Sequence, residues 1–250
     1  MRCYDRPSPN FDDRKDGAKP ELIVLHYTAM DSAEAALERL TDPAAKVSCH
    51  YLIDEKGNIF QLVDEDKRAW HAGISSWMGK DDVNSRSIGI EISNRNDEPY
   101  TKEQLFSLAL LCKDLMHRHK IPPQNVVGHS DVAPDRKQDP GAHFPWKKLS
   151  RHDIGRWPEL TVADQFNAAA AARSPKQLKK LFNEAGYGVN AFGKNKPKLK
   201  ELVIAFQRRY EPEVFSKPDA TPGKPTAETV AKLRAVARLN RPPQKDAPQV

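Results

Sequence analysis

The sequence predicts an α/β protein with a central mixed β-sheet flanked by helices, followed by a small three-helix module. Two observations predict the sheet and its helices: segments with strand patterns alternate with amphipathic helical segments, and the strand segments are short and apolar. A third observation predicts the module, because the last third of the chain is rich in Lys and contains three segments with apolar residues at helical spacing.

These patterns predict four regions along the 250 residues, a length that suits one or two domains. We expect a first domain over residues 1–158, a helical connector over 159–173, a three-helix domain over 174–240 and a disordered tail over 241–250. The connector is Ala-rich and the tail is polar and Pro-rich, as is typical of semi-rigid linkers and of disordered ends, respectively.

Five segments have the apolar runs or the period-two alternation that is typical of strands. They cover residues 21–27, 47–53, 59–63, 87–93 and 125–129. The second and third segments are separated by the turn sequence Glu55-Lys56-Gly57-Asn58, so we expect them to pair as a hairpin. The arm before the first strand, residues 1–20, is expected to be irregular.

Capping signals mark the helices. Asp31 begins the sequence Asp-Ser-Ala-Glu, a capping-box-like start with Glu34 three residues on, for a helix that runs to about Leu40. Thr101 and Gln104 form the same signature at the start of the longest helix, which ends before a pair of prolines. Three more helices are expected over residues 174–186, 199–210 and 226–239.

The formal net charge of +6 indicates a basic surface. Such a surface suits an anionic partner, which could be nucleic acid, an acidic membrane surface or an acidic polymer such as the cell wall. Solubility alone is an equally good explanation of the charge. No nucleic-acid-binding motif accompanies the basic residues, so a nucleic-acid partner is not expected. Nothing in the sequence indicates an oligomeric state.

The three cysteines are scattered and odd in number, which predicts no disulfide framework and no Cys-x-x-Cys metal pair. Residues 1–19 lack the apolar core of a signal peptide, and no apolar stretch is long enough to span a bilayer. The sequence therefore predicts a soluble chain, and the missing leader favours the cytoplasm.

Two histidines and one aspartate are candidate metal ligands. His26 lies at the end of the first predicted strand and His129 at the end of the last, and active sites of open α/β sheets collect beyond the carboxyl ends of strands. Asp139 follows in a loop rich in Pro and Gly. Two imidazoles and one carboxylate match a zinc site that keeps its fourth position for water. The alternative is that each is an ordinary packed or surface residue. No metal role is assigned to His50, His117, His119 or His143.

Six short motifs follow one another in a characteristic order. They are LHYTA at 25–29, VSCHYLI at 47–53, AWHAG at 69–73, Asn84 with SIGIEI at 87–92, GHSDVAP at 128–134 and KQDPG at 137–141. Together they resemble the N-acetylmuramoyl-L-alanine amidase 2 family, relatives of phage amidase lysozymes and of peptidoglycan-recognition proteins. The resemblance covers roughly residues 22–146, and six ordered motifs are far more specific than one.

The resemblance implies a zinc-dependent enzyme of peptidoglycan turnover and recycling. Its expected reaction is hydrolysis of the amide between muramic or anhydromuramic acid and L-alanine, in peptidoglycan or in muropeptides. The implied site residues are His26, His129 and Asp139 as Zn²⁺ ligands, Glu91 as a catalytic acidic residue near the metal-bound water, Lys137 as the lysine that stabilises the oxyanion, and Trp70, His71 and Asn84 as positions that line the substrate groove.

One residue departs from the family pattern. Cys49 stands where the phage and recognition-protein branches commonly have a Tyr, which points to the bacterial recycling and wall-remodelling branch. In that branch Glu91 is expected to carry the acid–base role. The rival hypothesis is a recognition protein that binds peptidoglycan without cutting it, but the presence of all three candidate ligands together with Lys137 and Glu91 argues against it.

Residues 174–239 resemble the peptidoglycan-binding domain 1 family. The resemblance rests on Leu181 with Gly186-Tyr187, on Ala205-Phe206-Gln207 and on residues 226–233. The alternative is a generic helical appendage. An anionic glycan or peptide carboxylates would suit the module's lysines at 176, 179, 180, 194, 196, 198 and 200. A wall-binding module favours the cell envelope or periplasm, whereas the missing leader favours the cytoplasm.

Overall fold

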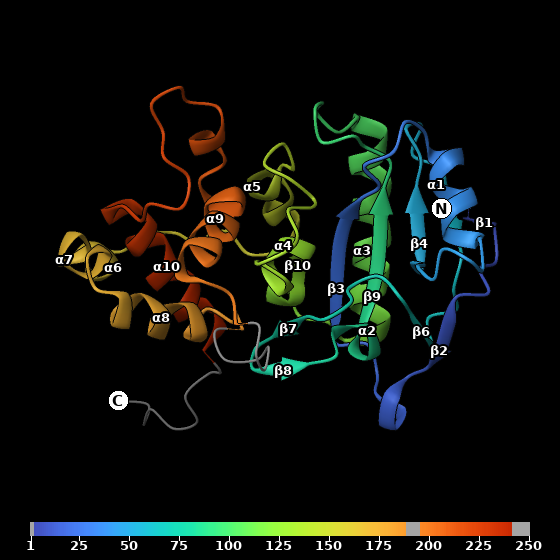
Figure 1. Ribbon diagram of the computed structural model, residues 1–250, viewed down its shortest axis with the longest axis horizontal. Coiled ribbons are helices and arrows are strands. Elements are labelled where there is room, and N and C mark those ends of the chain that lie inside the picture. Colours follow the sequence, from blue (N-terminus) through green and yellow to red (C-terminus); the bar gives the residue numbers. More distant parts are fainter. Residues whose placement is uncertain (1–2, 189–195, 242–250) are drawn as a thin grey trace.

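The computed structural model describes residues 3–188 and 196–241 (Figure 1). The strands are β1 (Cys3–Asp5), β2 (Phe11–Asp13), β3 (Leu22–Tyr27), β4 (Tyr51–Ile53), β5 (Ile59–Gln61), β6 (Lys67–Ala69), β7 (Ser76–Trp77), β8 (Lys80–Asp81), β9 (Ser87–Ile92) and β10 (Val126–Gly128). The α-helices are α1 (Ala33–Thr41), α2 (Val83–Arg86), α3 (Lys102–His119), α4 (His129–Val132), α5 (Trp146–Leu149), α6 (Val162–Gln165), α7 (Ala168–Ala172), α8 (Pro175–Glu184), α9 (Leu199–Tyr210) and α10 (Ala227–Asn240). Short 3₁₀ turns are η1 (Lys15–Gly17), η2 (Pro123–Asn125), η3 (Ser150–His152) and η4 (Pro212–Phe215).

The main sheet confirms the predicted fold class. Its six strands have the order β1-β5-β4-β9-β3-β10, and it is mixed because β4 and β5 pair antiparallel while the other neighbours run parallel. All five predicted strands are present, although the segment predicted over 47–53 is a strand only at Tyr51–Ile53. The central strands β3 and β9 pair over six residues, so they form the rigid middle of the sheet.

The leading arm is not irregular, and that expectation is wrong. β1 adds a parallel edge strand beside β5, and β2 pairs antiparallel with β6. The arm is held mainly by polar contacts: the buried Arg14 guanidinium donates to the carbonyl oxygens of Glu65, Ser85 and Ser87. A polar anchor of this kind leaves no apolar periodicity in the sequence, so strand patterns do not reveal it.

Two other expectations also differ from the structure. Helix α1 is capped by Ser32 rather than Asp31, because the Ser32 hydroxyl accepts the backbone N–H of Ala35. The Ala-rich segment 161–173 is not one helix, because Asn167 adopts a φ of 51° between α6 and α7. Residues 242–250, most of the predicted tail, and Lys194 lie outside the described residues. None of the helices within the described ranges is both long and apolar enough to cross a membrane.

The two faces of the sheet have different partners. Ile23 and Leu25 of β3 belong to a core shared with α3, whose predicted capping box of Thr101 and Gln104 is confirmed. Leu22 and Val24 point to the opposite face, because successive residues of a strand alternate. Figure 1 shows α1 near β4 and the C-terminal helices gathered beside β10.

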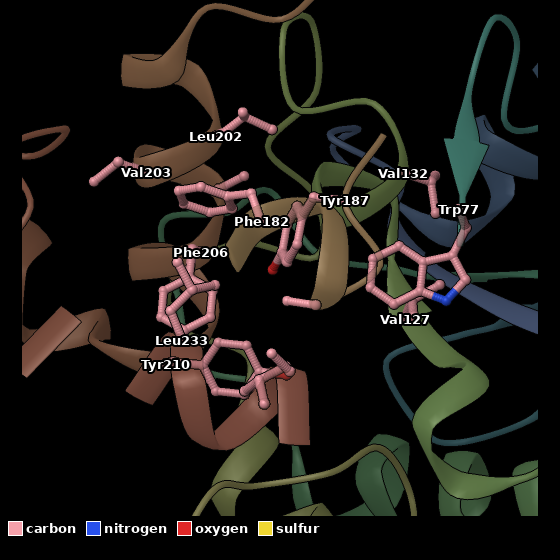
Figure 2. Close-up of a cluster of buried hydrophobic side chains, with 14 of the residues drawn as sticks. Trp77, Val127, Val132, Phe182, Tyr187, Leu202, Val203, Phe206, Tyr210 and Leu233 are labelled. Carbon is pink, nitrogen blue, oxygen red and sulfur yellow. The ribbon is translucent and has the colours of Figure 1, made fainter. Parts of the chain in front are cut away.

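The C-terminal helices pack directly against the sheet domain. α8 and α10 start after the predicted caps, Ser174 and Thr226, and α9 has the predicted bounds. Figure 2 shows Val127 and Val132, from β10 and α4, in one buried cluster with aromatic side chains of the C-terminal region. The labelled members from that region include Phe182, Tyr187, Leu202, Val203, Phe206, Tyr210 and Leu233. The predicted module therefore shares a core with the sheet.

His50 is confirmed as a packing residue and makes the fold sensitive to acid. The ring is fully buried, its Nδ1 accepts the Gly89 N–H at 3.0 Å, and its Nε2 lies 3.1 Å from the Lys67 carbonyl oxygen. Burial and the neighbouring charge of Arg14 lower the pKa of His50 to about 3. Protonation would put a hydrogen on Nδ1 and break the bond from Gly89.

We expect the free energy of unfolding to decrease as the pH is lowered from about 6.5 to about 3. In that window the unfolded chain protonates His50 and the folded chain does not, so each pH unit costs up to about 1.4 kcal/mol from this group. Above about pH 6.5 the group has no effect. Urea unfolding from about pH 7 to 5 should show a shallower pH slope in His50→Gln than in the wild type; equal slopes would contradict the assignment.

Candidate metal centre and active site

The three predicted ligands converge at one edge of the sheet. His26 is near the carboxyl end of β3, and His129 follows β10, its parallel neighbour. The loop after α4 returns Asp139 to the same point. His26 Nδ1 and His129 Nδ1 lie 2.8 and 3.0 Å from the same Asp139 carboxylate oxygen, and all three side chains are nearly buried. One ligand atom from each residue lies within 4.8 Å of the other two.

The donor set fits a divalent metal ion. His129 Nε2 lies 3.2 Å from the Ala72 carbonyl oxygen, which can only accept a hydrogen bond, so the neutral ring carries its proton there. The Nδ1 lone pair then faces Asp139. A bare imidazole nitrogen and a carboxylate at this separation would repel each other without a cation between them.

His71 contacts the candidate ligand His26 and supports its ring. His26 Nε2 lies 3.0 Å from His71 Nδ1, and His71 Nε2 lies 3.1 Å from the Ser87 hydroxyl, which donates to the Val83 carbonyl oxygen. This chain allows only one direction of donation, from His26 to His71 to Ser87, and leaves His26 Nδ1 free for a metal. The ring is seated on Gly89, where a Cβ atom would lie 2.5 Å from it.

Replacing His71 with Phe is expected to lower the affinity for a divalent ion by about 10- to 100-fold, because His26 loses the acceptor that fixes its tautomer and its orientation. His71→Asn, which can still accept, should retain more of the affinity. Competition with a chromophoric chelator measures both variants. Wild-type affinity in His71→Phe would remove the supporting role.

Glu91 lies in β9 beside the candidate metal centre. It is the register partner of His26, so both side chains point to the same face of the sheet. One carboxylate oxygen is buried and has no hydrogen-bond partner among the residues that the structure describes. Burial, reinforced by the charge of Asp139 and opposed by Lys137, raises the pKa of Glu91 well above its usual value. A carboxyl group of this kind can exchange a proton near neutral pH.

A cavity of about 410 Å³ opens over these residues. Lys137 is exposed on its wall, and Trp70 and His71 also line it. The Trp70 indole N–H donates to Asp12 at 2.7 Å. Helix α1 supplies another wall through Arg39 and Leu40. The cavity thus offers cations and an aromatic ring next to the three converging ligands.

Residues 16–142 match the family model described as N-acetylmuramoyl-L-alanine amidase, which is just over half of the chain. The chain belongs to this amidase family. It is 36% identical over 234 residues to the N-acetylmuramoyl-L-alanine amidase AmiD of Escherichia coli, covering 86% of this chain and 82% of the relative. It is also 38% identical over 160 residues to the 1,6-anhydro-N-acetylmuramyl-L-alanine amidase AmpD of Salmonella typhimurium, covering 57% of this chain and 86% of the relative.

Solved structures agree with the amidase fold over nearly the whole chain. A complex of Escherichia coli AmiD with the substrate anhydro-N-acetylmuramic acid-L-Ala-D-γ-Glu-L-Lys has a TM-score of 0.73 and 34% identity, and the match covers 91% of this chain and 92% of that one. AMPDH3 from Pseudomonas aeruginosa, in complex with anhydromuramic pentapeptide, gives a TM-score of 0.75 and 33% identity, with 91% and 95% covered. The C-terminal helices are therefore included in the structural likeness.

Asn84 and Cys49, which the sequence analysis singled out, do not line the cavity. Asn84 is buried, and its side-chain oxygen accepts the backbone N–H groups of His71 and Ala72, so it shapes the loop behind the site. The structure thus places Asn84 behind the loop of His71 and Ala72 rather than among the residues that line this cavity. Cys49 is fully buried, and its thiol donates to the Tyr51 carbonyl oxygen. Burial raises the pKa of Cys49, which keeps the thiol neutral.

Asp131 is a structural residue of the site that sequence reasoning missed. It lies in the same short helix as His129, and it accepts hydrogen bonds from the Gly128 N–H and from the Tyr187 hydroxyl, each at 2.8 Å. The Arg209 guanidinium of α9 forms a buried ion pair with it. Two of these partners come from the C-terminal region, so that region supports the helix that carries the candidate ligand His129. A long-range pair of this kind has no local sequence signal.

Proposed function

We propose that this amidase is zinc-dependent and hydrolyses the amide between muramic or anhydromuramic acid and L-alanine. The convergence of two imidazole Nδ1 atoms on one ionised carboxylate carries the proposal. His26, His129 and Asp139 would hold the ion, a donor set that suits Zn²⁺ with one open position. Zinc bound there would polarise the substrate carbonyl and lower the pKa of water.

The chain's own residues account for the remaining chemistry. Glu91 takes a proton from the water that attacks the amide carbon, and returns it to the leaving nitrogen of L-alanine as the C–N bond breaks. Lys137, on the cavity wall, provides positive charge for the carbonyl oxygen as that oxygen becomes negative. Trp70 and α1 bound the space in which the sugar and the peptide lie. The products are a muramic carboxylic acid and a free peptide.

The relatives support the choice of substrate class. AmiD and AMPDH3 were solved with anhydromuramyl peptides, and AmpD is named for the same class. We propose that this chain accepts such muropeptides in peptidoglycan turnover and recycling. The C-terminal helices are proposed to act as a peptidoglycan-binding module, which places the enzyme at the cell envelope, where the polymer lies. Fractionation of cells followed by immunodetection tests that location.

Removal of the metal tests the reaction. We expect a chelator to abolish release of peptide from an anhydromuramyl tripeptide, and added Zn²⁺ to restore it, because the three ligands alone provide no strong nucleophile at neutral pH. Mass spectrometry of the products from the tripeptide and from intact wall identifies the bond that is cut. A zinc-loaded sample that binds the tripeptide but releases nothing would instead support a recognition protein.

A further inference from the structure

A second groove lies at the boundary between the sheet domain and the C-terminal helices. It has a volume of about 630 Å³ and lies between the α5–η3 segment and α10. Figure 1 shows α5 at this boundary, near α9. All residues that line the groove come after residue 142, where the family match ends. The groove is therefore separate from the metal cavity and from the part of the chain that the family model covers.

The groove is lined by four cations and one acid. Arg238 is already engaged, because it donates to Asp164 at 2.9 Å and to the Glu159 carbonyl oxygen at 3.0 Å. In contrast, the side chains of Lys147, Arg151 and Arg156 form no hydrogen bond or ion pair with any residue in the described ranges. Three cations without an ion-pair partner outnumber the single acid, Glu159, around one concavity, so the concavity attracts anions.

Trp157 adds an aromatic surface to these charges. It is half-buried, packs against Tyr210 with ring centroids 5.6 Å apart, and has the Lys147 ammonium 6.0 Å from its own centroid. Its ring is thus held in place from inside the molecule while part of it lines the groove. A fixed indole can cover the apolar face of a sugar, and the neighbouring cations can pair with carboxylates on the same ligand.

We propose that this groove binds the peptidoglycan polymer through the free carboxylates of its peptide stems, as a retention site apart from the metal cavity. The inference rests on the proposed function for its choice of polymer. A concave site with an aromatic wall suits a single extended strand that carries both sugars and carboxylates. The groove and its aromatic wall fit an extended strand better than a flat anionic membrane, and a nucleic acid is the competing polyanion that the test includes.

The test compares two triple variants with equal loss of charge. The groove variant is Lys147→Gln with Arg151→Gln and Arg156→Gln. The matched control is Lys56→Gln with Lys102→Gln and Lys113→Gln, all exposed, outside the C-terminal helices and distant in sequence from the groove. Co-sedimentation with purified sacculi is measured for chelator-treated protein. We expect roughly tenfold or greater loss of affinity in the groove variant, and a change within about twofold in the control.

Raising the salt from about 50 to 200 mM should weaken sacculus binding of the wild type more than that of the groove variant, because fewer ion pairs remain to be screened. Equal binding by the groove variant and the wild type would overturn the proposal. So would equal losses in the two triple variants, or tighter binding to single-stranded DNA or anionic vesicles than to sacculi.

Cleavage of the soluble tripeptide separates this proposal from the proposed function. The groove variant should cut the tripeptide at the wild-type rate, since none of its substitutions touches the metal cavity. If the wild type itself fails to cut the tripeptide, the proposed reaction is wrong, while the sacculus measurements still decide whether the groove is a retention site.

Discussion

Glu91→Gln is expected to lower kcat for the anhydromuramyl tripeptide by about 10²- to 10⁴-fold, the usual contribution of a general acid–base residue. The amide has nearly the same shape as the carboxyl group but cannot take up or release the proton. Because Glu91 contributes no atom to the ligand cluster, the variant should bind zinc as the wild type does. Steady-state kinetics and metal content measured on the same preparation test both parts.

The matched control for this prediction is Glu38→Gln, on the exposed side of α1. It removes the same charge without touching the metal centre, and should leave kcat unchanged. Full turnover by Glu91→Gln would exclude Glu91 from proton transfer. Loss of zinc from that variant would show instead that Glu91 holds the site together.

Arg209→Ala is expected to lower the free energy of unfolding by about 3–5 kcal/mol, the usual cost of leaving one member of a buried ion pair without its partner. Asp131 would keep its bonds from Gly128 and Tyr187 but lose the only salt-bridge partner that it has within the described residues. The guanidinium also lies 3.9 Å from the centroid of Trp146, so aromatic packing is lost as well. Chemical unfolding measures the change.

An exposed pair from the same region provides the control for Arg209. Arg241 pairs with Glu184 at 3.2 Å on the surface, and Arg241→Ala should cost no more than about 1 kcal/mol. We further expect Arg209→Ala to bind zinc more weakly, because Asp131 lies on the same turn of helix as His129. A cost below about 1 kcal/mol for Arg209→Ala would show that the pair does not stabilise the fold.

Local signals predicted most of the fold. The strands at 21–27 and 87–93 and the capping box at Thr101 depend on nearby residues, and the structure places them within a residue or two of their expected bounds. The arm at residues 1–20 could not be predicted, because Arg14 anchors it through carbonyl groups more than fifty residues away in sequence. The expected connector is not one helix because Asn167 adopts a left-handed backbone conformation. The helix propensities of the neighbouring residues do not predict this conformation.

For the site, the sequence resemblance identified the candidate ligands. The parallel order of β10, β3 and β9 explains why these residues lie close together. Asn84 shows the limit of a motif, since a motif gives a residue's position but not the direction of its side chain. The pairing of Asp131 with Arg209 joins residues 78 positions apart and depends on tertiary packing, so no pattern in the sequence predicts it.

The pairing of His26 with Glu91 in adjacent parallel strands restricts how this family member can evolve. Successive side chains of a strand point to opposite faces of the sheet. Deleting one residue inside β9 would therefore move Glu91 to the face that packs against α3 and bring an isoleucine to the face that carries His26. Such a deletion would leave the apolar content of the strand nearly unchanged. We therefore expect natural length variation to accumulate in the connecting loops, while the two central strands keep a constant residue count.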